Sequence, residues 1–177
     1  MATTNITLAG FGGQGILFAG KMLAYAGLMG GKEVSWLPSY GPEMRGGTAN
    51  CSVVISDEPI GSPLVLEPDV LVAMNRPSLA KFIDDVKPGG IVIIDATMVE
   101  DRTDRTDISF FPVEATKLAE DAGLKGLANV LLVGKLNKEA KLVDNDALKA
   151  AVKKCVSAKR QEMIAYNEQA LELGAQQ

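Results

Sequence analysis

The sequence contains no histidine and only two cysteines, and both scarcities exclude kinds of chemistry. Without histidine, the chain lacks the commonest general base and the commonest metal ligand of proteins. Cys51 and Cys155 cannot supply the four thiolates that a structural zinc site or an iron–sulfur cluster needs. No acid/base pair stands out either. We therefore expect no catalytic residue and no metal site in this chain, and a role as one subunit of a larger assembly.

An excess of basic charge and a long apolar run are also missing. The 18 Lys and Arg residues are outnumbered by 22 Asp and Glu, which disfavours nucleic acid as a partner. The apolar segment 16–29 contains Lys21 and is shorter than the roughly 20 residues of a membrane span. The N-terminus lacks the basic start of a signal peptide. We expect a cytoplasmic protein with reduced cysteines and no membrane contact, although a disulfide stays possible.

Strand-like and helix-like segments alternate along most of the chain. The predicted strands are 5–9, 33–37, 48–56, 69–74, 91–95 and 107–111. The predicted helices are 14–29, 77–86, 113–122, 127–138, 144–155 and 158–173. This order predicts an α/β fold, a Rossmann-like layered sheet flanked by helices, with a helical C-terminal tail. The length suits a single domain spanning residues 1–177.

Two of these helices carry specific expectations. Helix 14–29 is apolar on nearly every side, so we expect it to be buried in the sheet packing or under a partner. In helix 158–173, Ser157 and Gly174 are the expected caps. Its predicted apolar face carries Met163, Tyr166, Ala170 and Leu173.

A glycine-rich turn separates the first strand from the first helix. Gly10, Gly12 and Gly15, with Gly13 and Gln14 between them, fit G-x-G-x-x-G in the strand–turn–helix context of nucleotide-binding domains. However, the second strand ends in Trp-Leu-Pro rather than in the acidic residue that holds a ribose, and no Walker Lys-Ser/Thr follows. A dinucleotide site, a site for another phosphate-bearing ligand, and a tight or partner-facing turn all stay open.

A proline- and glycine-rich segment, 38–47, follows the second strand. Tyr40, Glu43 and Arg45 lie on it, at an edge where α/β sheets bind ligands and partners. A rigid connection with solvated charges is the alternative interpretation. Asn75 and Arg76 after the strand 69–74, and Asp95 at the end of the next strand, are weaker candidates for the same crevice, while helix capping is the plain alternative for Asn75.

Three stretches together resemble a known family. They are Gly10-Phe-Gly-Gly-Gln-Gly15, Pro38-Ser-Tyr-Gly-Pro-Glu-Met-Arg-Gly-Gly-Thr-Ala-Asn50 and Asp69-Val-Leu-Val-Ala-Met-Asn75. Their order and spacing resemble the γ subunit of 2-oxoacid:ferredoxin oxidoreductases, from about residue 5 to residue 96 and more loosely beyond. The second stretch is the most specific of the three.

The resemblance implies a subunit role. In that family the complex decarboxylates a 2-oxoacid such as pyruvate, ketoisovalerate or 2-oxoglutarate, reduces ferredoxin and forms acyl-coenzyme A. Thiamine diphosphate with Mg and the [4Fe–4S] clusters belong to partner subunits of the α, β and δ types. The γ chain is expected to carry no cofactor of its own and to help shape the approach of coenzyme A.

The expected site residues are those of the two glycine-containing segments. Gly10, Gly12, Gly13, Gln14 and Gly15 form the first group. Tyr40, Glu43 and Arg45 form the second, which is expected to face coenzyme A or a partner chain. The alternative function is a free-standing Rossmann-like module that binds a nucleotide at the glycine turn.

Overall fold

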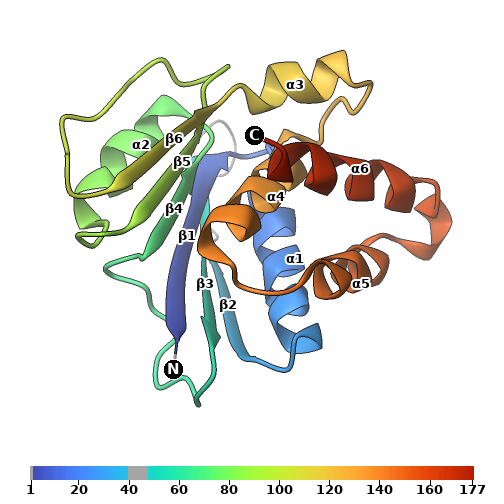
Figure 1. Ribbon diagram of the computed structural model, residues 1–177, viewed down its shortest axis with the longest axis horizontal. Coiled ribbons are helices and arrows are strands. Elements are labelled where there is room, and N and C mark those ends of the chain that lie inside the picture. Colours follow the sequence, from blue (N-terminus) through green and yellow to red (C-terminus); the bar gives the residue numbers. More distant parts are fainter. Residues whose placement is uncertain (1, 40–47) are drawn as a thin grey trace.

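The computed structural model describes residues 2–39 and 48–177 (Figure 1). The strands are β1 (Thr3–Phe11), β2 (Glu33–Ser39), β3 (Thr48–Ser56), β4 (Val70–Ala73), β5 (Ile91–Asp95) and β6 (Ser109–Val113). The α-helices are α1 (Ile16–Met29), α2 (Arg76–Phe82), α3 (Ala115–Asp121), α4 (Ala128–Ala140), α5 (Asn145–Cys155) and α6 (Met163–Ala175). Two 3₁₀ turns, η2 (Ile83–Asp85) and η3 (Ala158–Arg160), complete the described elements.

All six strands form one mixed sheet in the order β2-β3-β1-β4-β5-β6. The strands β1, β4, β5 and β6 are parallel, and β3 runs antiparallel to both of its neighbours, β1 and β2. The central strands β4 and β5 are buried on both faces, which explains why their sequences are continuous apolar runs. The predicted α/β fold is confirmed. The antiparallel β3 between β1 and β2 is its departure from the Rossmann order.

Helices cover the two faces of the sheet unequally (Figure 1). The helices α1, α4, α5 and α6 lie on one face, whereas α2 lies on the other, beside β4, β5 and β6. The larger core cluster joins α1 and α4 to the sheet and includes Ile6, Leu23 and Leu131. The smaller cluster, around Leu71 and Val92, lies under α2.

Helix α1 is buried by the chain itself. It packs against β1, β2 and β3 on one side and against α5 on the other. Gly20 lets it approach the sheet, because a Cβ there would overlap the sulfur of Cys51. Among its large apolar side chains, Leu28 and Met29 remain substantially exposed. Packing within the chain therefore accounts for the buried apolar residues of α1.

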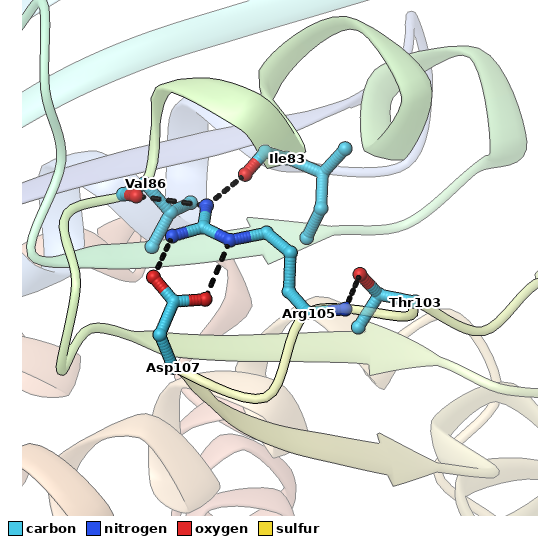
Figure 2. A network of polar contacts seen from close by, with 5 residues as sticks. All are labelled: Ile83, Val86, Thr103, Arg105 and Asp107. Carbon is cyan, nitrogen blue, oxygen red and sulfur yellow. Dashed lines mark hydrogen bonds and ion pairs between the residues drawn. The ribbon is translucent and has the colours of Figure 1, made fainter.

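The connection from β5 to β6 has no helix, and Arg105 makes several of the contacts that hold it (Figure 2). The Nη1 of Arg105 donates to the carbonyl oxygens of Ile83 and Val86, at 2.8 Å each. Its Nε and Nη2 donate to the two carboxylate oxygens of Asp107, at 2.9 and 2.6 Å. The backbone N–H of Arg105 donates to Thr103 Oγ1 at 3.2 Å. These contacts fasten the segment 96–108 to both ends of η2, since Ile83 is its first residue and Val86 directly follows its last.

Several predicted boundaries require correction. Strand β2 extends through Pro38 to Ser39, and β6 includes Pro112, because both are edge strands, where proline removes no needed donor. The predicted helix 77–86 is divided into α2 and η2, and the predicted helix 158–173 into η3 and α6.

The predicted end and apolar face of the last helix were also partly wrong. Gly174 lies inside α6, against the backbone of Leu131 in α4, rather than capping the helix. Tyr166 is exposed, and the buried face is formed by Asn167, Ala170, Leu171 and Gly174. Ser157 does act as a cap, since its hydroxyl accepts the N–H of Lys159 at the start of η3. Within residues 2–39 and 48–177, no helix has the length and apolarity needed to cross a membrane.

Candidate functional site

The four parallel strands end at one edge of the sheet, and a pocket lies there. After β1 the chain continues to β2, which lies on one side of β1 in the sheet, whereas β4 lies on the other side of β1. Such a switch point is where open α/β sheets bind ligands. The pocket has a volume of about 250 Å³. Its lining includes Gly13 and Gln14 from the glycine turn, Met74 after β4, and Thr116, Lys125 and Asn129 from the α3–α4 region.

The glycine turn is tied together by the side chain of Gln14. The Oε1 of Gln14 accepts the backbone N–H of Phe11 at 2.7 Å, and its Nε2 donates to the carbonyl oxygen of Met74 at 3.0 Å. The backbone N–H of Gln14 donates to the carbonyl oxygen of Phe11 at 3.1 Å. The turn therefore has a fixed shape and is anchored to the end of β4.

Internal packing accounts for Gly10 and Gly15 of the fingerprint. A Cβ on Gly10 would lie 2.6 Å from Gln14 Oε1. Gly15 adopts a left-handed φ of 74°, and a Cβ there would overlap the amide of Asn129. Gly13 also has a positive φ, 98°, but the space beside it is open, and Gly12 lies in the exposed part of the turn. These contacts explain the spacing of Gly10 and Gly15 whether or not a ligand binds.

Asn129 is a site residue that sequence reasoning missed. Its Nδ2 donates to the carbonyl oxygen of Gly15 at 3.0 Å, which joins the start of α4 to the start of α1. The residue is 5% exposed, and its Oδ1 has no hydrogen-bond partner among the described residues. Asn129 and Gly15 are 114 positions apart in the sequence. An asparagine at the start of a predicted helix gives no signal of such a long-range contact.

Of the three weaker candidates, Arg76 is exposed, pairs with Asp101 at 3.1 Å and does not line the pocket, whereas Asp95 and Asn75 hold neighbouring elements. The Oδ2 of the fully buried Asp95 accepts the hydroxyl of Thr116 at 2.5 Å, and its Oδ1 accepts the backbone N–H groups of Thr97 and Thr116. Asn75 caps α2, because its Oδ1 accepts the N–H of Ser78 at 2.8 Å. Asp95 thus positions the start of α3 beside the pocket, and the capping interpretation of Asn75 is confirmed.

Tyr40, Glu43 and Arg45 lie outside the described residues. The strands on either side can be placed: Thr48 at the start of β3 is opposite Phe11, and Ser39 at the end of β2 is opposite Asn50. Both flanks of the segment 40–47 therefore lie at the same edge of the sheet as the glycine turn.

Both cysteines are free. Burial raises the pKa of the Cys51 thiol to about 12, against an opposing effect of the Trp36 indole, so this thiol is a core group. Burial also raises the pKa of the half-buried Cys155, against an opposing effect of Lys21. Within the part of the chain that the structure describes, no three His, Cys, Asp or Glu side chains come together as a metal site would require.

A larger hollow, about 350 Å³, lies among α4, α5 and α6. Its polar lining includes Lys149 and Glu172, which pair with each other at 3.4 Å across the hollow. We regard the smaller pocket as the candidate site, because it alone of these two lies at the carboxyl edge of the sheet.

The comparisons with known proteins agree on one family. Residues 5–177 match the family model described as pyruvate ferredoxin/flavodoxin oxidoreductase. The chain is 42% identical over 172 residues to ketoisovalerate oxidoreductase subunit VorA of Methanothermobacter marburgensis, covering 97% of this chain and 36% of that protein. It is 39% identical to 2-oxoglutarate synthase subunit KorC of Methanocaldococcus jannaschii, covering 84% of this chain and 81% of KorC. The chain thus spans about a third of VorA but most of KorC.

Solved structures share the fold. The γ subunit of a keto/oxoacid ferredoxin oxidoreductase from Geobacter sulfurreducens PCA superposes with a TM-score of 0.87 at 26% identity, over 99% of this chain and 96% of that chain. A 2-oxoglutarate:ferredoxin oxidoreductase from Magnetococcus marinus, solved with 2-oxoglutarate, coenzyme A and succinyl-CoA bound, gives a TM-score of 0.88 at 24% identity. That match covers 99% of this chain and 31% of the other, and it shows the fold alone.

Proposed function

The chain belongs to the pyruvate ferredoxin/flavodoxin oxidoreductase family, and we propose that it acts as the γ-type subunit of a cytoplasmic 2-oxoacid:ferredoxin oxidoreductase. The complex would oxidise and decarboxylate a 2-oxoacid, form its acyl-coenzyme A and reduce ferredoxin. The observation that carries the proposal is the family match, which extends over residues 5–177. Relatives of similar length named as 2-oxoglutarate synthase subunits and as common γ subunits support it.

We assign the redox cofactors to the partner subunits. Thiamine diphosphate with Mg, and the [4Fe–4S] clusters, would be held by chains of the α, β and δ types. A [4Fe–4S] cluster takes four cysteine ligands, whereas this chain has only Cys51 and Cys155, and Cys51 is fully buried in the core. The contribution of this chain would be to shape the path of coenzyme A and to hold partner chains in place.

The surface that would do this is the carboxyl edge of the sheet. Gly10, Gly12, Gly13, Gln14 and Gly15 form its central turn, and we propose that Tyr40, Glu43 and Arg45 in the adjacent segment face coenzyme A or a partner chain. The support is the position of the described flanks of that segment. Thr48 lies opposite Phe11, beside the turn, and Ser39 lies one strand further along the same edge of the sheet. The guanidinium of Arg45 is suited to bidentate pairing with a phosphate or a carboxylate.

Co-expression with the genes that adjoin this one tests the subunit role. A tagged chain should co-purify with a thiamine-containing, iron–sulfur complex that reduces a viologen dye when a 2-oxoacid and coenzyme A are both supplied. Pyruvate, 2-oxoisovalerate and 2-oxoglutarate, tested separately, would identify the substrate. A complex with full coenzyme A-dependent activity that forms without this chain would refute the role, as would dye reduction by the chain alone.

Arg45→Ala tests the role of the segment, with Arg160→Ala on η3 as the matched control. The first variant should raise the coenzyme A concentration needed for half-maximal rate or weaken assembly, and the second should behave as wild type. If both variants match wild type in the complex, Arg45 faces neither coenzyme A nor a partner.

A further inference from the structure

We propose that the hollow among α4, α5 and α6 binds a free amino acid with an apolar side chain, whose carboxylate pairs with Lys141 and whose ammonium pairs with Glu168. This hollow shares no lining residue with the pocket beside the glycine turn. Its volume, about 350 Å³, falls at the lower end of the roughly 300–1,000 Å³ of ligand pockets, which suits a small molecule. The proposal does not depend on the subunit role.

The hollow exists because the helices around it pack as two separate pairs. Helix α6 packs closely against α4, where Gly134 and Gly174 let the two backbones approach each other. Helix α5 packs mainly against α1 and touches α6 in few places. The ion pair of Lys149 and Glu172 spans the space between α5 and α6 at 3.4 Å. Both side chains are about half exposed, so this pair contributes little to stability and a ligand can displace it.

The lining of the hollow combines an apolar wall with charges of both signs. Val143, Leu148 and Leu171 form the apolar part, one from the connection between α4 and α5 and one from each of α5 and α6. The lysines and glutamates come from α4, α5 and α6. One of the lysines is already engaged, because the Nζ of Lys138 donates to the carbonyl oxygen of Gln177 at 2.8 Å. An apolar wall beside a few polar groups is the usual composition of a small-molecule site.

Lys141 and Glu168 carry the charges that are available to a ligand. Both line the hollow, and neither forms an ion pair with another described residue. A purely anionic ligand would meet the carboxylates of Glu168 and Glu172, and a purely cationic ligand would meet the lysines. A zwitterion pairs with both signs, and the apolar wall then takes its side chain. These charges therefore favour an apolar amino acid over a fatty acid or an amine.

The backbone of Lys141 supports a role for its side chain. Among the described residues it is the one non-glycine residue with a positive φ, 51°. It ends α4 in the left-handed conformation that glycine or asparagine adopts more easily. Attraction to the negative end of the helix would favour a lysine anywhere in the last turn, so it does not explain this strained position. Strained backbone of this kind is concentrated at binding sites.

Titration of the ¹⁵N-labelled full chain with leucine, followed by amide chemical shifts, tests the proposal. Leucine should shift amides around the hollow, in residues 137–149 and 168–175, and leave those of the glycine turn unchanged. Three analogues each lack one part of the ligand: glycine lacks the apolar side chain, 4-methylpentanoate the ammonium, and leucinamide the carboxylate. Each analogue should bind about tenfold more weakly than leucine, because one group of the hollow loses its partner.

Lys141→Gly separates binding from stability. It relieves the strained backbone, so the melting temperature should rise, while leucine binding should weaken about fivefold. Glu168→Gln should weaken binding by a similar factor without changing the melting temperature. Lys153→Ala on α5 is the control, since Lys153 is exposed and does not line the hollow, and it should bind leucine like wild type. The proposal is overturned if leucine shifts no amide around the hollow, if any analogue binds as tightly as leucine, or if Lys141→Gly binds like wild type.

Discussion

The contact between α4 and α6 depends on two glycines, and replacing one of them gives a prediction with an unambiguous sign. A Cβ on Gly174 would overlap the carbonyl oxygen of Leu131, and a Cβ on Gly134 would overlap that of Leu171. In each case the separation is far below the 3.0 Å that real Cβ atoms keep from such atoms. The obstacle is backbone, which no side-chain rotation can move aside. Gly174→Ala must therefore push the two helices apart by roughly 1 Å.

Two effects of Gly174→Ala oppose each other, and the structure decides which is larger. Alanine is the better helix former by about 1 kcal/mol, which alone would stabilise the protein. Overpacking of a core costs about 1–3 kcal/mol, and more when the backbone must move. Because the clash is with backbone, we take the upper end of that range, about 3 kcal/mol, which leaves a net loss of about 2 kcal/mol in the free energy of unfolding. For a chain of this size, that lowers the melting temperature by roughly 4–8 °C.

Urea unfolding followed by circular dichroism measures this loss. The midpoint should fall while the slope of the transition stays constant, since the surface exposed on unfolding is unchanged. Gly61→Ala is the matched control, because nothing lies within 4 Å of a Cβ there and its φ is not positive. A Gly174→Ala protein as stable as wild type, or more stable, would show that helix propensity dominates and that the close approach of α4 and α6 is not maintained.

Contacts of Arg105 and Asp95 and the burial of Cys51 can each be tested separately. Arg105→Ala should lower the melting temperature at pH 7, because the ion pair with Asp107 and two carbonyl contacts are lost (Figure 2). Hydrogen bonding to Arg105 lowers the pKa of Asp107. The stability that this pair contributes is therefore complete above the ordinary carboxyl pKa and is lost as pH falls through the lowered value. The difference in melting temperature between Arg105→Ala and wild type should be smaller at pH 3 than at pH 7. A thiol reagent at pH 8 should label Cys155 before Cys51, which should react only in denaturant; equal rates in the folded protein would contradict the burial of Cys51. Asp95→Ala should speed amide hydrogen exchange in α3 while leaving α5 unchanged, and unaltered exchange in α3 would show that Asp95 does not hold it.

The sequence predicted the sheet elements well because their patterns are local. The predicted strand 48–56 is confirmed as β3, in which the alternate residues Cys51, Val53 and Ile55 are buried. The local pattern does not show that Val54 and Ser56 on the opposite face are also buried, each at 2% exposure, because that depends on neighbours distant in sequence. Helix ends were predicted less well where contacts between residues distant in sequence decide them. Gly174, for example, packs closely against α4 rather than ending the helix.

The antiparallel β3 explains why the Rossmann fingerprint is incomplete. In the Rossmann order the strand after the first helix lies beside the first strand, and an acidic residue near the carboxyl end of this second strand reaches the ribose. Here β3 lies between β1 and β2, and its first residue, Thr48, is the residue opposite Phe11 at the edge. An acidic residue at the end of β2 would thus be one strand too far from the turn. The glycine turn is instead contacted by Asn129 of α4, whose Nδ2 donates to the carbonyl oxygen of Gly15 at 3.0 Å.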